Sequence, residues 1–352
     1  MEEFGSWSII TTNFLIVLYL ALGGVIFSSL LHLVNAKWRF QVRWLACANL
    51  ALFPIAFVLL LILLSNGEAT FPWLAGAHAG KEGGEHLSGW LNYNFLVIRE
   101  IAGFILTFGL CYTFVKLQKQ ASEDPSPVVQ RQFRNVALSI PFLYVIYGSM
   151  VAWDFEMTME AGWHSASYAA YHFQSNFQGF LAYFVLMVYV MDKTGNMNDD
   201  FERKIYNYLA QLILGMTILW IYFYFTQYLV FWYGRLPFEM GRFIRMFEGG
   251  YFPLFVLLLG FKFIIPFCVF IFTRARHSRS TIIIVAMFIL AGTWLERYLW
   301  ISGSVASRYF HTPLSDPFDV LVTGLIIVAA FISLRWRLNR DGLLNVRHYV
   351  DV

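Results

Sequence analysis

Charged residues are scarce in this chain: Asp, Glu, Lys and Arg make up 13% of its 352 residues, whereas hydrophobic residues make up 59%. A soluble globular domain carries about 25% charged residues. The composition therefore excludes a soluble domain and predicts an integral membrane protein, with the lipid bilayer as its surroundings and no nucleic-acid partner. The net charge of +3 says little, because it averages two faces of opposite character.

Cysteine is scarce as well, and the three cysteines, Cys47, Cys111 and Cys268, all lie in apolar stretches. No CxxC pattern and no Cys/His ligand spacing occurs, which argues against a zinc site, an iron–sulfur cluster and a covalently attached haem. A haem held by two histidines needs two that face each other within the membrane. Only His172 lies well inside an apolar stretch, while His32 lies near an end. We expect no metal and no cofactor on this chain itself.

Long apolar runs are what the sequence has in abundance. A bilayer crossing by a helix needs about 20 predominantly apolar residues. The first run follows the acidic residues Glu2 and Glu3 rather than the basic start of a signal peptide, so we expect a retained helix. The pattern predicts an all-α polytopic transmembrane bundle in one integral membrane domain, 1–352, built as two four-helix units plus an extra helix. Nine spans are predicted, at about 8–35, 43–65, 93–118, 135–153, 167–191, 206–233, 249–273, 280–303 and 316–335.

The basic residues divide unevenly between the two sets of alternating loops. Seventeen of the 25 Lys and Arg residues fall in one set of loops and the C-terminal tail, and five fall in the other. Cytoplasmic loops carry the excess of Lys and Arg. The asymmetry therefore predicts an N-terminus outside and a cytoplasmic C-terminus. The remaining three basic residues, Arg99, Lys262 and Arg297, lie within the spans.

Ionisable residues inside a bilayer are costly unless paired or hydrated, and they mark functional candidates. Arg99 and Glu100 lie about two turns into the third span, and Glu296 and Arg297 lie at a similar depth in the eighth. Neighbouring helical residues point about 100° apart, so a pairing between helices is expected, either Arg99 with Glu296 or Arg297 with Glu100. A structural lock between helices and a role in a proton relay or quinone site are equally favoured.

A second polar group lies where spans four and five meet. Tyr168 and His172 recur at i and i+4, with Ser175 or Asn176 continuing the row, which predicts one polar stripe along a helix. Carboxylates, His and Tyr along a stripe are the groups that a proton wire or a quinol pocket requires. Hydrogen bonding between helices is the structural alternative. The connecting segment before this helix adds Asp154, Glu156, Glu160 and His164 to the candidates.

Lys262 is the third candidate, near the middle of span seven and four residues before Pro266. A proline at that spacing leaves the Lys262 carbonyl without its usual helical partner. Two interpretations stay open: a broken-helix site, or a lysine that extends along a crevice of the bundle toward water.

Several stretches of this sequence together resemble one family. They are NFLIVLYLALGGVIFSSLLHLVNAKWRFQVR, the FPWL that follows, NFLVIREIAGF, EAGWHSASYAAYHF, FTQYLVFWYGRLP and TWLERYLWI. In this order, over nearly the whole chain, they are similar to the F subunit (ActF-like) of bacterial alternative complex III. That family belongs with the NrfD/PsrC-like membrane subunits of quinone-linked oxidoreductases. Two departures stand out: family members are usually described with ten spans, and Glu296 stands where an aspartate is expected.

The resemblance implies a subunit of a respiratory quinol:cytochrome c (or other acceptor) oxidoreductase in the bacterial inner (cytoplasmic) membrane. Its expected partners are an NrfD-like C subunit, a multihaem cytochrome c and iron–sulfur subunits. The haems and iron–sulfur clusters lie in those partners, and menaquinol or another quinol binds this or a neighbouring subunit. The family proposal of proton half-channels maps onto Glu100, Asp154, His172 and Glu296.

Three other functions are weighed against this one. The chain is alternatively a quinone-binding, NrfD-like anchor of a molybdopterin or iron–sulfur oxidoreductase. It is alternatively an ion or solute transporter, for which only the Lys262–Pro266 feature speaks. A purely architectural subunit is compatible with every residue named above.

Overall fold

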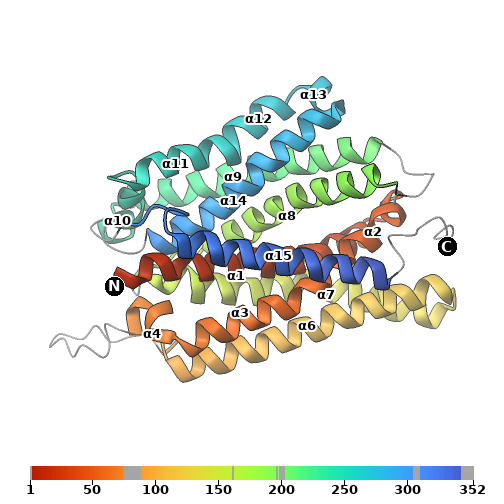
Figure 1. The fold of residues 1–352 in the computed structure, drawn as a ribbon, viewed down its shortest axis with the longest axis horizontal. Coiled ribbons are helices and arrows are strands. Elements are labelled where there is room, and N and C mark those ends of the chain that lie inside the picture. The colour runs from red at the N-terminus through yellow and green to blue at the C-terminus, as the bar shows by residue number, and fades with distance from the viewer. Residues whose placement is uncertain are drawn as a thin grey trace.

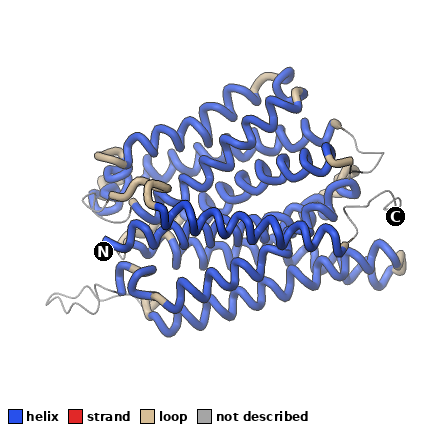
Figure 2. Tube along the Cα trace, viewed as in Figure 1, coloured by secondary structure: helices blue, strands red, loops and turns tan. Residues whose placement is uncertain are grey.

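The computed structural model describes residues 2–74, 89–160, 162–195, 197, 203–303 and 310–341. Within these ranges the chain is a bundle of helices and contains no strand (Figure 2). Its elements are α1 (Glu2–Leu33), α2 (Arg39–Ala48), η1 (Asn49–Leu52), α3 (Phe53–Ser65), α4 (Gly67–Thr70), α6 (Tyr93–Glu123), α7 (Pro127–Phe155), η2 (Met157–Met159), α8 (Tyr168–Lys193), α9 (Lys204–Tyr233), α10 (Pro237–Met246), α11 (Tyr251–Leu259), η3 (Gly260–Ile264), α12 (Ile265–Phe270), α13 (Thr273–His277), α14 (Arg279–Ser302) and α15 (Pro317–Arg340).

Eight helical segments of the described chain are long and apolar enough to cross a membrane, so the protein is a multi-pass helical membrane protein. They are Trp7–Leu33, Arg39–Ser65, Tyr93–Glu123, Pro127–Met159, Lys204–Tyr233, Tyr251–Phe270, Arg279–Ser302 and Pro317–Arg340. The helix α8 has 26 residues, which is long enough to cross, but it is more polar than these eight segments and is not one of them. It coincides with the fifth predicted span.

The long helices run side by side along one axis, which gives the bundle two distinct ends (Figure 1). The end where α1 begins, which also holds α4 and α10, is called the amino end below. The opposite end, where α15 ends and α13 lies, is called the carboxy end. The helices α1, α3, α6 and α7 pack together, α8 packs against α9 and α14, and α15 packs against α1.

Helix α1 lies at the centre of the bundle, and two glycines allow its neighbours to approach closely. A Cβ on Gly23 would lie 2.3 Å from Cγ of Phe180 in α8, and one on Gly24 would lie 2.1 Å from the Ala46 carbonyl oxygen in α2. Small residues at helix interfaces let backbones approach closely in membranes. The glycine pair therefore fixes α1 between α2 and α8.

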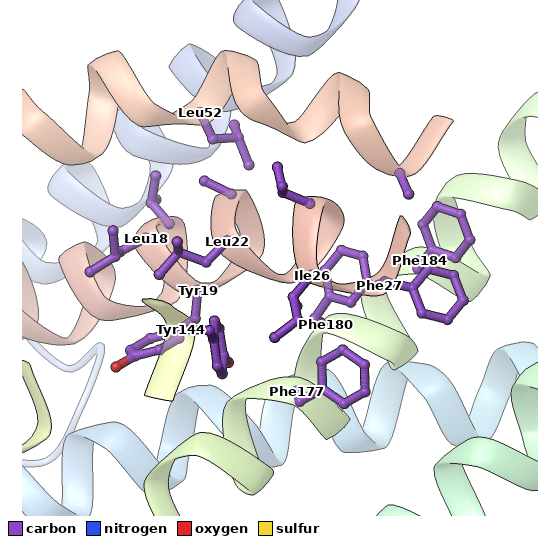
Figure 3. Packing of buried hydrophobic residues seen from close by; sticks show 14 of the residues in the cluster. Leu18, Tyr19, Leu22, Ile26, Phe27, Leu52, Tyr144, Phe177, Phe180 and Phe184 are labelled. Atoms are coloured by element: carbon purple, nitrogen blue, oxygen red, sulfur yellow. The ribbon is translucent and has the colours of Figure 1, made fainter. Parts of the chain in front are cut away.

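Aromatic rings fill the space between α1 and α8 toward the carboxy end. Phe27 contacts Phe180 and Phe184, with ring centroids 5.9 and 5.3 Å apart, and Figure 3 shows these rings next to one another. Toward the amino end, Tyr19 meets Tyr144 of α7 at 5.9 Å in an edge-on contact. The apolar core thus gives way to polar side chains in one direction, where the candidate site lies.

Candidate functional site

Glu156 is the centre of a buried charged cluster. It directly follows α7, and its side chain is fully buried. The hydroxyl of Tyr168 donates to its Oε2 at 2.6 Å, and Nη1 of Arg297 lies 2.8 and 2.7 Å from its two carboxylate oxygens. Nδ1 of His172 lies 2.5 Å from the same Oε2. The predicted stripe on α8 therefore faces a carboxylate that the end of α7 turns inward.

The imidazole of His172 has two possible hydrogen-bonding arrangements. Nδ1 is 2.5 Å from Glu156 Oε2 and also 2.5 Å from Nη1 of Arg297. A protonated Nδ1 donates to Glu156, whereas a bare Nδ1 accepts from Arg297, and the tautomer selects between them. Nε2 is buried and has no partner among the described residues. Histidine here is a group whose proton can change place without a movement of the backbone.

Glu296, the residue before Arg297 in α14, provides a second buried carboxylate. Its Oε1 lies 2.8 Å from Nη2 of Arg297 and accepts from the indole N–H of Trp220 at 3.0 Å. Its Oε2 accepts from the Ser175 hydroxyl at 2.5 Å and lies 3.3 Å from Nζ of Lys262. Arg297 therefore bridges the two carboxylates, and the α8 stripe reaches both of them.

Lys262 lies in the π-helical turn η3, where the helix between α11 and α12 widens but does not break. Its Nζ donates to the Ser175 carbonyl at 3.2 Å and to the Thr293 hydroxyl at 3.0 Å. Its own carbonyl, which Pro266 leaves without a helical donor, accepts from Gln178 at 3.3 Å. The side chain is fully buried. The interpretation of a lysine extending to water is therefore wrong, and the broken helix is replaced by a π turn.

The formal charges of this buried network cancel. Glu156 and Glu296 carry two negative charges, Arg297 and Lys262 carry two positive ones, and all four side chains are 0% exposed. Bringing each ion out of water costs several kcal/mol unless it is paired and hydrogen-bonded. Since every charge has an opposite neighbour within 3.3 Å, the network is stable as a unit and sensitive to the loss of any member.

Arg242 of α10 closes the network toward the amino end. Its guanidinium donates to the backbone carbonyls of Glu156 at 2.7 Å and Trp300 at 2.5 Å. It also packs over the rings of Trp163 and Trp300, 4.6 and 4.9 Å from their centroids. Burial lowers the pKa of Arg242 from its ordinary value. It stays charged, because an arginine side chain is not deprotonated in proteins.

Beyond this cap the polar groups reach the surface. Glu160 pairs with Arg245 of α10, and both side chains are partly exposed. His164 is exposed and lies outside the buried network. Charged and aromatic side chains thus lie between the network and the surface at the amino end.

Most of the fully buried side chains in the carboxy half of the same helices are apolar. Along α8, about 21 Å separate Gln178 from Asp192, at 1.5 Å per residue. Asp192 forms an ion pair with Arg279 of α14 at 2.9 Å, near the far end of the bundle. The side chains between these layers are at most 2% exposed and apolar: Leu181, Val185 and Val188 in α8, Leu209 and Ile213 in α9, and Ile282, Val285 and Ile289 in α14. No polar route to the carboxy end is seen among them.

A separate ion pair lies on the other side of α7. Arg99 of α6 binds Asp154 through two nitrogens, with Nε to Oδ2 at 2.7 Å and Nη2 to Oδ1 at 2.6 Å. The indole N–H of Trp90 donates to Asp154 Oδ1 at 2.7 Å. Glu100 is fully buried beside this pair. Asp154 and Glu156, two residues apart, thus serve different clusters.

The structure corrects the pairing expected from the sequence. Arg99 pairs with Asp154 rather than Glu296, and Arg297 pairs with Glu156 and Glu296 rather than Glu100. The prediction is wrong because it paired residues by depth, whereas the last turn of α7 and the residue after it bring two further carboxylates, Asp154 and Glu156, to that depth. Trp220 and Arg242, which the sequence pattern does not single out, also belong to this region: Trp220 donates to Glu296, and Arg242 donates to the Glu156 carbonyl.

The chain matches no protein-family model, and no curated protein matches it.

Proposed function

We propose that this chain is an F-type membrane subunit of a quinol-oxidising complex of the alternative complex III type. The single observation that carries the proposal is the buried network that joins Glu156, His172, Arg297, Glu296 and Lys262. Three of these residues lie in sequence stretches that resemble the family: His172 near the start of α8, and Glu296 and Arg297 in α14. Membrane pumps and transporters use such intramembrane carboxylates and histidines as proton relays.

In this proposal the network takes up and gives back protons at the amino end. His172 and Glu156 share a short contact through which a proton moves between nitrogen and oxygen. Arg297 keeps the carboxylates charged, and Lys262 balances the second of them. Because most of the fully buried side chains in the carboxy half of α8, α9 and α14 are apolar, the exchange is with the amino end in this conformation. This chain is then a site that holds protons during quinol oxidation.

The proposal includes nine membrane crossings: the eight apolar segments named above and, in addition, α8. A helix of 26 residues spans about 39 Å at 1.5 Å per residue, more than a hydrocarbon core of about 30 Å. Its polar residues face α9, α14 and the turn after α7 rather than lipid. The basic residues at the carboxy end, such as Lys119, Arg134 and Arg337, support the proposal that this end faces the cytoplasm of a bacterium. The amino end then faces outward, where quinol oxidation releases protons.

The partners are the ones that the resemblance implies: an NrfD-like C subunit, a multihaem cytochrome c and iron–sulfur subunits. The chain is tagged at a terminus, extracted in mild detergent and purified from its native membrane. We expect these subunits to co-purify and the sample to oxidise menaquinol with an added electron acceptor. Recovery of the chain alone, as a homo-oligomer without quinol oxidation, would contradict the proposal and favour a transporter.

A quinol site on this chain is a second candidate, favoured by one atom. Nε2 of His172 is buried without a partner among the described residues, and the ring centroids of His172 and Tyr19 lie 4.8 Å apart. The nitrogen could form a hydrogen bond with a quinone oxygen, and the aromatic ring could pack against the quinone ring. A photoreactive quinone that labels α8 around His172, and fails to do so in His172→Phe, would favour this role.

A further inference from the structure

Asp154 is held more firmly than a simple ion pair requires. Arg99 binds both of its oxygens, and the indole of Trp90 donates to one of them. Trp90 also accepts from Nη1 of Arg99 through its carbonyl at 2.8 Å, and the guanidinium lies 4.0 Å from the centroid of its indole ring. These contacts fix one carboxylate and one guanidinium, whose charges cancel, at the amino end of the bundle, near the start of α6 and the end of α7.

Glu100 stands next to this neutral pair without a cation of its own. It is fully buried, and neither carboxylate oxygen accepts a hydrogen bond from a donor among the described residues. Its carboxyl group lies close to that of Asp154, because Asp154 is bound by Arg99, the residue that precedes Glu100 in α6. Two carboxylates cannot hydrogen-bond to each other, because both only accept. A hydrogen bond between them requires that one of the two carries a proton.

We propose that Glu100 and Asp154 form a proton-binding site that holds one shared proton. Glu100 is the neutral acid and donates to Asp154, since Asp154 is the member that Arg99 and Trp90 stabilise as an anion. With this proton the cluster has no net charge. Without it the cluster holds one uncompensated negative charge among fully buried side chains, which is a costly state. Carboxyl pairs that share one proton are known where two acids lie in contact.

The site is separate from the network at Glu156. Asp154 lies on the side of α7 that meets α6, whereas Glu156 binds residues of α8 and α14. The hydroxyl of Tyr147 in α7 is also buried and has no hydrogen-bond partner among the described residues. The inference does not rest on the proposed function, because the shared proton follows from the contacts whichever complex the chain belongs to.

Infrared spectroscopy of the full-length chain tests the proposal. A protonated carboxylic acid gives a carbonyl band apart from those of carboxylates, and the band shifts in heavy water. We expect Glu100→Gln to remove such a band at neutral pH. The matched control, Glu296→Gln, is expected to leave it in place, because Glu296 is bound by Lys262 and Arg297 as an anion. A spectrum of Glu100→Gln that keeps every acid band of the wild type would overturn the proposal.

Thermal unfolding of the same variants gives a second readout. A glutamine at position 100 replaces a neutral donor with another neutral donor, so the midpoint is expected to stay near that of the wild type. Asp154→Asn leaves the Arg99 charge without its partner, and we expect a clearly lower midpoint. Equal losses in Glu100→Gln and Asp154→Asn would mean that Glu100 is an anion, which contradicts the shared proton. If both variants fail to fold, an isotope-edited spectrum of the wild type with labelled glutamate still reports whether a buried glutamic acid is protonated.

Discussion

Replacing Glu296 with Gln is the sharpest perturbation of the buried network. The substitution keeps the shape of the side chain but removes one of two negative charges that lie between Lys262 and Arg297, at 3.3 and 2.8 Å. The network then carries one excess positive charge in a region that is 0% exposed. Breaking a buried ion pair by removing one partner costs about 3–5 kcal/mol. We expect a loss of this size in the free energy of unfolding.

A second substitution that restores the charge balance makes this expectation specific. In the double variant Lys262→Met with Glu296→Gln, Arg297 and Glu156 remain as a balanced pair. The double variant is therefore expected to be more stable than the two single losses added together predict, by about 2–3 kcal/mol, as for residues of one network. Equilibrium unfolding of the purified chain in detergent, followed by circular dichroism, measures the three variants. Strict additivity of the losses would refute the reasoning from charge balance.

Two further predictions concern packing and the amino-end cap. Gly23→Ala is expected to lower the free energy of unfolding by about 1–3 kcal/mol, because its methyl group would lie 2.3 Å from the buried Phe180 ring. The control is Gly215→Ala, where no atom lies within 4 Å of the new methyl group. It should change the free energy of unfolding by less than about 0.5 kcal/mol. Equal effects in thermal unfolding would contradict the close approach of α1 to α8. Arg242→Lys should cost about 1–3 kcal/mol, since one ammonium cannot serve the carbonyls that the guanidinium binds. Hydrogen exchange should then rise in residues 156–160, and unchanged exchange would count against the cap.

The helices were predictable from the sequence because length and apolar composition alone specify a bilayer crossing. Each of the nine predicted spans contains a long helix or a run of helices in the structure. The polar stripe predicted for α8 was also informative. Tyr168 and His172 contact the carboxylate of Glu156, and Ser175 contacts that of Glu296. A period of 3.6 residues is a local property, so it is visible without the fold.

The partners of the buried charges were not predictable in the same way. Depth along a helix gives one coordinate, whereas a contact also depends on the direction each side chain takes around the axis and on the turns between helices. Glu156 follows the last residue of α7, and only its turn brings it under α8 and α14. Lys262 could not be placed for the same reason, because Glu296 is its partner only through the way η3 packs on α14.

Proton release during quinol oxidation tests the central claim most directly. The purified complex is reconstituted into vesicles, and protons released per quinol oxidised are compared between the wild type and the charge-balanced double variant of Lys262 and Glu296, with Gly215→Ala as the control. The network is predicted to handle protons, so the double variant should release fewer protons per quinol or turn over more slowly, while the control matches the wild type. Unchanged proton yield together with unchanged turnover in the double variant would contradict the account.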